Sequence, residues 1–182
     1  MDVLGAVRAV APPGAVVGAG VIRNIVWDHL HGYQRPTDLA DLDVAFFDPL
    51  DLSEERERRI EASLQQRLPE VPWQAINQAG VHLWFSKVFG YSVEPLASIE
   101  DAVATWPETA TAVAVRLSHA DRLEVLAPCG LGDLLGMVLR RNPWRISYEL
   151  FLKRLKSKRI VEKWPRVRVI YEDVIPVGGR LT

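Results

Sequence analysis

Two aspartates separated by one residue, Asp41 and Asp43, stand at the start of an apolar run, residues 41–47. In a β-strand alternate side chains share a face, so the two carboxylates lie on one face while Leu42 and Val44 lie on the other. Like charges held side by side repel, and this is tolerated at an exposed edge or around a cation. Carboxylates completed by substrate phosphates are the usual ligands of Mg²⁺. The pair therefore predicts a magnesium site; the alternative is two ordinary acids at an exposed loop end.

A small-residue turn, Gly18-Ala19-Gly20, precedes this pair and follows a short apolar segment. Free backbone N–H groups at the start of a helix bind anions, and the helix dipole adds to the attraction. Arg23 and Asn24 fall in the first turn of the expected helix, where their side chains can reach the same ligand. By itself the turn is more often only a tight strand-to-helix connection. It predicts a phosphate site only together with the acids.

The same turn is also close to the glycine fingerprint of dinucleotide-binding proteins, and Asp48 ends the next apolar run as a ribose-binding acid would. The third glycine of that fingerprint allows a helix and a strand to pack closely, and Arg23 is too large for this role. The fingerprint also gives no use to acids at the start of the second strand. Dinucleotide binding is therefore the second choice.

The elements that must position these residues alternate irregularly between helix and strand, which predicts an α+β (α/β) domain with a mixed sheet. Apolar periodicity, capping residues and turn residues predict helices at residues 3–10, 21–31, 51–68, 98–106 and 131–139. They predict strands at residues 15–17, 41–47, 73–77, 81–85, 111–117 and 122–127. Gly32 is expected to cap the helix after the small-residue turn.

The charges of the chain are divided unevenly. Residues 140–168 hold eleven Lys or Arg and two acids, a balance of +9, so the rest of the chain carries −10. A basic C-terminal helix on an acidic body favours an anionic partner, although a solvated amphipathic helix has the same composition. The length predicts a single domain, residues 1–182, with residues 140–168 as a basic helical region.

Cysteine content and hydropathy exclude several classes of protein. The single cysteine, Cys129, rules out an internal disulfide framework and a cysteine-based zinc site. The first residues lack the basic end and apolar run of a signal peptide, and no apolar stretch is long enough for a membrane span. We therefore expect a cytoplasmic protein without a membrane partner.

The order of small-residue turn, helix and Asp-X-Asp strand resembles the nucleotidyltransferase superfamily that includes DNA polymerase β. Residues 18–32 are similar to the signature of one bacterial family of predicted nucleotidyltransferases, once filed as a domain of unknown function. Further segments similar to that family follow in the same order at residues 77–79, 106–113, 127–131 and 163–165. There are two departures: twenty residues separate Gly20 from Asp41, and Gly80 stands where an arginine is expected. The resemblance implies a polymerase β-like fold, with a mixed sheet flanked by helices.

The resemblance also implies a reaction: Mg²⁺-dependent transfer of a nucleoside monophosphate from a nucleoside triphosphate to a hydroxyl group. The acceptor is open between a small molecule, a protein and an RNA. Asp41 and Asp43 would hold the metal ion. The nucleotide would be bound by Gly18, Ala19, Gly20, Arg23 and Asn24.

Superfamily enzymes place a third carboxylate on a later strand, and Glu124 in residues 123–126 is the best candidate here. Glu124 is equally compatible with the exposed face of a strand, and Asn77 is an alternative occupant of the position. An intact Asp-X-Asp pair favours an enzyme. The alternative is a catalytically inactive nucleotide-binding or antitoxin-like interaction protein with the same fold; the sequence sets no oligomeric state.

Overall fold

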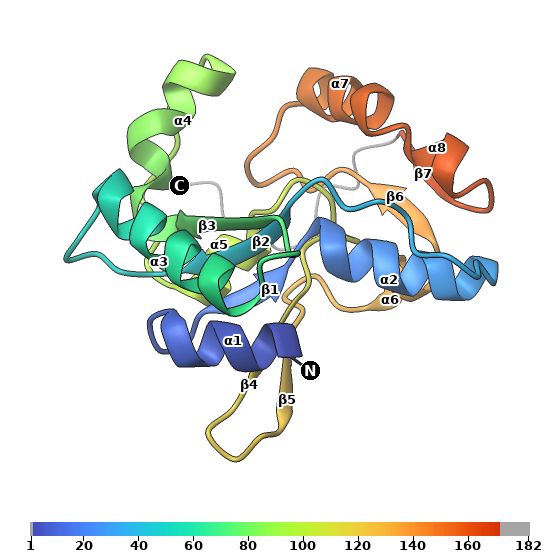
Figure 1. Ribbon diagram of the computed structural model, residues 1–182. Coiled ribbons are helices and arrows are strands. Elements are labelled where there is room, and N and C mark those ends of the chain that lie inside the picture. Colours follow the sequence, from blue (N-terminus) through green and yellow to red (C-terminus); the bar gives the residue numbers. More distant parts are fainter. Residues whose placement is uncertain (1, 172–182) are drawn as a thin grey trace.

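The computed structural model describes residues 2–171, and its centre is a five-stranded mixed sheet in the order β3-β2-β1-β4-β5 (Figure 1). The strands are β1 (Val16–Gly18), β2 (Leu42–Phe46), β3 (Trp73–Asn77), β4 (Ala114–Leu117) and β5 (Leu123–Leu126). β1 is antiparallel to β2 and β4, β2 is parallel to β3, and β4 and β5 form an antiparallel hairpin. A second, two-stranded parallel sheet joins β6 (Val138–Arg140) to β7 (Arg168–Ile170).

Helices surround the sheet, as the sequence predicts. They are α1 (Asp2–Val10), α2 (Gly20–His31), α3 (Glu54–Arg67), α4 (Val81–Phe89), α5 (Ile99–Ala104), α6 (Gly132–Leu135), α7 (Tyr148–Lys158) and α8 (Ile160–Lys163), with a 3₁₀ turn at Gln78–Gly80. Within residues 2–171 none of them is long and apolar enough to cross a membrane. Gly32 caps α2 with a left-handed backbone, φ 71°, as predicted.

The two faces of β2 have different environments, which confirms the predicted alternation. Leu42, Val44 and Phe46 lie in the core that α1 and α3 cover, together with Leu64. Ala45 points to the opposite face, where it packs with α5. Asp43 lies on this second face because it alternates with its two apolar neighbours.

The segment 81–85 is part of helix α4, so the prediction of a strand there is wrong. Its buried residues, Val81 and Phe85, are four apart, which is a helical spacing, while Leu83 and Trp84 between them are exposed. A short apolar run does not distinguish the two structures by itself. The consequence is an aromatic helix beside the end of β3.

The prediction of one helix over residues 131–139 is also wrong at its second half. Helix α6 ends at Leu135, and Met137 has a left-handed φ of 51°, which turns the chain. Leu139 then enters β6 and pairs with Val169 of β7, which lies far away in sequence. Pairing of β6 with β7 supplies the backbone hydrogen bonds that a continued helix would have made.

The C-terminal region is anchored to α2 through two tryptophans. The rings of Trp27 and Trp164 are fully buried and meet edge to face, with centroids 5.5 Å apart. Trp164 Nε1 donates a hydrogen bond of 2.7 Å to the carboxylate of Asp28, and Trp27 Nε1 donates one of 2.8 Å to the carbonyl of Leu134. Burying both polar tips with partners makes this a specific contact. This contact packs the C-terminal region, which includes the basic helix α7, against helix α2.

Candidate functional site

A cavity of about 270 Å³ lies on the face of the sheet that carries Asp43. Its walls come from β2, from the end of β3, from α4, from the segment after α5 and from the C-terminal region. The residues that line it are Ala19, Asp43, Val44, Ala45, Ile76, Gln78, Val81, Trp84, Phe85, Phe89, Thr105, Trp106, Pro107, Arg145, Ile146 and Arg154. It thus joins the predicted acidic strand and the predicted small-residue turn in one space.

The two aspartates interact, and the folded protein disfavours the ionised form of Asp43. Burial and, to a smaller extent, the charge of Asp41 raise the pKa of Asp43 to about 6, against the opposing charges of Lys158 and Arg154. Asp41 lies directly before β2 and Asp43 within it. A carboxylate held in this way gains free energy when a cation approaches. The pair is therefore suited to binding a hard metal ion.

The small-residue turn lies beside the acids, but its three residues differ in role. Ala19 takes the unusual backbone angles φ 58° and ψ −121°, and its N–H donates to the carbonyl of Val113. Ala19 provides no side-chain cap to α2. The first N–H groups of a helix have no partner within it, so those after Ala19 are available to an anion. The strained Ala19 directs the start of α2 toward the cavity.

Gly18 is required by close packing. A Cβ atom at this position would lie 2.5 Å from the Trp106 ring and 2.9 Å from the Cβ of Ala114. Trp106 also lines the cavity. The glycine thus allows an aromatic wall of the cavity to lie directly on β1.

Replacement of Gly18 by alanine is expected to lower the free energy of unfolding by about 1 to 3 kcal/mol, because Trp106 and β4 must move. Gly5→Ala is the matched control, since a Cβ in α1 meets nothing within 4 Å and alanine is the better helix former. That control is expected to be neutral or stabilising. Urea unfolding of both variants checks the prediction, and equal stabilities would contradict it.

Arg23 and Asn24 are buried behind the turn. Arg23 Nη2 donates a 2.8 Å hydrogen bond to Asn24 Oδ1, and its guanidinium lies 5.2 Å from the ring centroid of Trp164. Burial lowers the pKa of Arg23, whereas the charge of Glu108 raises it. Arg23 Nε is buried and has no hydrogen-bond partner among the described residues. A Cβ built on Gly20 would lie 3.8 Å from Arg23 Nη2, so the cation is next to the helix start.

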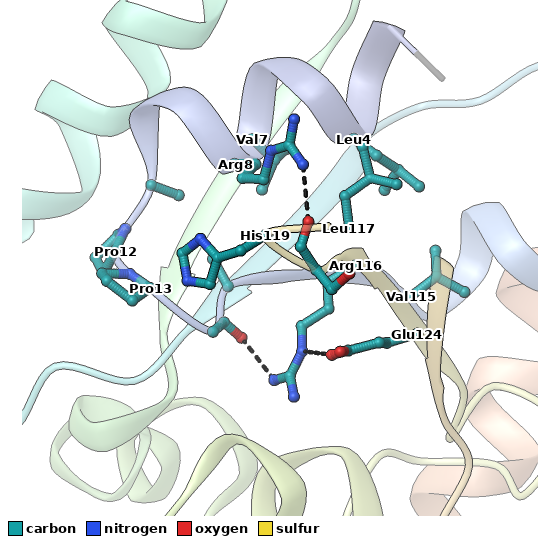
Figure 2. Close-up of a pocket in the computed structure, with 14 residues that line it drawn as sticks. Leu4, Val7, Arg8, Pro12, Pro13, Val115, Arg116, Leu117, His119 and Glu124 are labelled. Atoms are coloured by element: carbon teal, nitrogen blue, oxygen red, sulfur yellow. Dashed lines mark hydrogen bonds and ion pairs between the residues drawn. The ribbon is translucent and has the colours of Figure 1, made fainter. Parts of the chain in front are cut away.

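Glu124, the predicted third carboxylate, lies elsewhere. It is on β5, the far edge of the sheet, with β1 and β4 between it and β2. Strands are ~4.8 Å apart, which puts Glu124 roughly 14 Å from β2 across the sheet. Figure 2 shows it at a different cavity, of about 370 Å³, where Arg116 binds it with a distance of 2.8 Å. The structure does not bring Glu124 together with the two aspartates.

Asn77, the alternative occupant, lies on β3 but faces away. It pairs with Phe46, so it shares the face that α3 covers. Its side-chain amide donates to the carbonyls of Asp48 and Asp51, and its oxygen accepts from the N–H of Asp48. All these bonds fasten the loop after β2. Across residues 2–171 no three of the His, Cys, Asp and Glu side chains form a group that could hold a metal ion.

Four further residues of the site were not singled out from the sequence: Trp106, Glu108, Arg154 and Lys158. Glu108 is almost completely buried and pairs with Arg154, with 2.8 Å between Oε1 and Nε. Thr111 Oγ1 donates to the other oxygen of Glu108 at 2.8 Å. Arg154 and Lys158 are one turn apart on α7, and both lower the pKa of Asp43. The sequence shows this region as a surplus of charge, but it does not indicate which cations meet the acids.

Comparison with known proteins gives the family and the fold of this chain. A sequence model of a nucleotidyltransferase family matches residues 5–169. One similar solved structure, an NMR structure described as revealing a CCA-adding enzyme head domain, has 29% identity and a TM-score of 0.78. The match covers 93% of this chain and 88% of that one.

Larger solved structures share the fold. A tRNA-processing enzyme in an apo form has 17% identity and a TM-score of 0.53, and a second apo form has 16% and 0.51. The matches cover 93% and 92% of this chain, which spans only 42% and 44% of those enzymes. A comparison with curated protein sequences gave no match. Since the family model spans nearly the whole chain, and the five-stranded mixed sheet matches the fold of the head domain, this protein belongs to the nucleotidyltransferase family.

Proposed function

We propose that the protein transfers a nucleoside monophosphate from a nucleoside triphosphate to a hydroxyl group, with Mg²⁺ held by Asp41 and Asp43. The observation that carries the proposal is the meeting of opposite charges at one cavity: Asp43, Ala19 at the uncapped start of α2, and Arg154 line it, and the charges of Asp41 and Lys158 act on Asp43. A Mg²⁺–triphosphate complex has both charges and would match both groups. The donors fit the metal, because two hard carboxylates with substrate phosphates form a usual magnesium site.

Each part of the site then has a distinct task. Bound Mg²⁺ would stabilise the charge that develops on the α-phosphate and favour loss of the acceptor's proton. The N–H groups in the first turn of α2 would hold the outer phosphates, supported by the nearby charge of Arg23. Arg154 and Lys158 would neutralise the pyrophosphate as it leaves. Glu108 keeps Arg154 in place through the 2.8 Å ion pair.

The second candidate, an inactive nucleotide-binding protein, is favoured by one observation. The described residues include no third acid at the aspartate pair. Binding and transfer must therefore be measured separately.

The experiment incubates the purified protein with each α-³²P-labelled nucleoside triphosphate, Mg²⁺ and a fractionated cell extract. Labelled product is expected with wild type and absent with Asp43→Asn. Arg58→Gln, an exposed change on α3, is the control and is expected to retain transfer. Melting temperature with and without Mg²⁺ and triphosphate measures binding independently. A rise in melting temperature without any labelled product would support the inactive candidate. The absence of both the rise and the labelled product would contradict nucleotide binding altogether.

A further inference from the structure

The cavity has a second part whose chemistry differs from that of the aspartate pair. Ile76, Val81, Trp84, Phe85 and Phe89 line it from β3 and α4. Trp84 is 38% exposed and lies nearly parallel to Phe85, with an angle of 30° between the rings. Such a surface binds a flat, apolar group by stacking.

An arginine without an acidic partner faces this aromatic part. Arg145 lies over the ring of Phe85, 5.6 Å from its centroid, and lines the cavity. Its Nη2 donates to a backbone carbonyl, that of Glu94, and the ion pairs of residues 2–171 include none to Arg145. Burial lowers its pKa. A partly buried guanidinium of this kind gains free energy from an anionic ligand.

The in-line geometry of phosphoryl transfer indicates that the acceptor binds at the aromatic part of the cavity. In phosphoryl transfer the attacking and leaving oxygens lie roughly in line on opposite sides of phosphorus. The proposed holders of the leaving pyrophosphate are the start of α2, which directly follows β1, and α7, which lies on the same side as α2 in Figure 1. β3 and α4 lie on the other side of β2, and Figure 1 shows α4 and α7 on opposite sides above the sheet. An acceptor hydroxyl must therefore come from the aromatic part.

The lining also limits the charge of the acceptor. Among its described residues Asp43 is the one carboxylate, and Arg145 and Arg154 are cations. A polycationic acceptor would have no acidic partners there, and its binding would be unfavourable. An acceptor with a flat ring, a hydroxyl and an anionic group matches all the observations.

Building on the function proposed above, we propose that the acceptor is a nucleotide, whose base stacks on Trp84 and whose phosphate meets Arg145. The transfer then forms a bond between the acceptor's ribose oxygen and the α-phosphorus of the donor. The bond from that phosphorus to the pyrophosphate breaks, and the hydroxyl proton is released. The acceptor is either a free nucleotide or the terminal nucleotide of a strand, since both present this chemistry.

The test measures binding of the acceptor without turnover. The full chain is saturated with Mg²⁺ and α,β-methylene-ATP, which occupies the donor site. Isothermal titration with AMP, adenosine and a single-stranded 12-nucleotide RNA then measures three affinities. AMP or the RNA is expected to bind, and AMP more tightly than adenosine. A preference for the RNA that weakens with salt identifies a strand end, and a preference for AMP identifies a free nucleotide; both support the proposal.

Two variants and one control make the assignment specific. Trp84→Ala is expected to weaken nucleotide binding roughly 5- to 100-fold, the usual effect of losing one stacked base. Leu83→Ala, on the same helix and 54% exposed but outside the cavity, is expected to have no effect. Arg145→Gln is expected to remove the preference for AMP over adenosine while leaving adenosine binding unchanged. This last readout does not respond to a general loss of structure.

Three results would overturn the inference. Equal affinities in Trp84→Ala and Leu83→Ala would show that the base does not stack there. Weaker binding of the methylene analogue itself in Trp84→Ala would assign the aromatic part to the donor's base. No binding of AMP or RNA by a protein that does bind the analogue would reject a nucleotide acceptor and leave the proposed transfer intact. If the analogue does not bind either, the proposed function fails first.

Discussion

Asp43→Asn is expected to abolish nucleotidyl transfer and, at the same time, to stabilise the metal-free protein at pH 7. Removal of one of two metal ligands removes most of the charge stabilisation at the reacting phosphate, so the rate should fall at least roughly a hundredfold. The stabilisation follows from the raised pKa of Asp43, about 6 against an ordinary 3.8. At pH 7 the folded protein bears the cost of a partly buried charge next to Asp41, which asparagine does not carry.

The pH dependence of this stability difference has a definite sign. The folded pKa is raised, so Asp43 destabilises the folded state only when it is ionised. Below about pH 4 wild type and Asp43→Asn should be equally stable. As pH rises through the interval from 3.8 to about 6 wild type loses stability relative to the variant, with a difference at pH 7 of about 1 to 2 kcal/mol after allowance for solvent screening.

Urea unfolding between pH 4 and 8 without divalent metal, with activity measured in parallel, checks both parts. Asp38→Asn is the matched control, because Asp38 is exposed and lies only three residues before Asp41. It should change neither stability nor rate. Addition of Mg²⁺ should raise the melting temperature of wild type but not of Asp43→Asn. A variant that is destabilised at pH 7, or that keeps full activity, would show that Asp43 has a structural role instead.

Glu124→Gln should retain transfer in the same activity assay, since Glu124 lies on β5 at the far edge of the sheet.

The second large effect is expected at the ion pair of Glu108 and Arg154. Arg154→Gln leaves the carboxylate of Glu108 buried without its charged partner, which should cost about 2 to 4 kcal/mol of the free energy of unfolding. It also removes a cation from the cavity, so the rate of transfer should fall roughly 100-fold or more. One variant therefore combines a structural and a functional loss.

The double variant Glu108→Gln, Arg154→Gln separates the two losses. It removes both charges of this pair, so part of the stability should return, less the favourable charge that Glu108 supplies to buried Arg23; the cation Arg154 is still missing, so transfer should stay low. Glu108→Gln alone should retain the cation, with a raised KM and a smaller change in kcat. Urea unfolding and steady-state kinetics of the three variants form a double-mutant cycle. Recovery of activity in the double variant would contradict a direct role of Arg154.

Local patterns in the sequence predict the first half of the fold well. The helices predicted at residues 3–10 and 21–31, the strand with Asp43 and the cap at Gly32 are confirmed, because alternation, periodicity and turn residues act over a few positions. The errors at residues 81–85 and 131–139 have a different origin. In the first, a short apolar run does not distinguish a helix from a strand, and in the second a strand forms only because β7 is there to pair with it.

At the N-terminus of α3 the local pattern predicts the position of the helix but not its N-cap residue. Asp51 and Glu54 have capping-box spacing, but the N-cap of α3 is Ser53, whose hydroxyl accepts from the N–H of Arg56. Asp51 instead accepts from the N–H and hydroxyl of Ser53. The helix is where the pattern places it, and the choice between two neighbouring caps depends on the loop that Asn77 fastens.

The sequence by itself determined the acidic pair, its shared face and the small-residue turn before it, because each depends on neighbours along the chain. Only the tertiary structure decided which charges meet that pair. Strand order moved Glu124 to the far edge of the sheet, and the packing of Trp27 on Trp164 brought Arg154 and Lys158 of α7 to Asp43. Spacing along the chain specifies which side chains share a face, whereas packing between distant segments specifies which faces share a cavity.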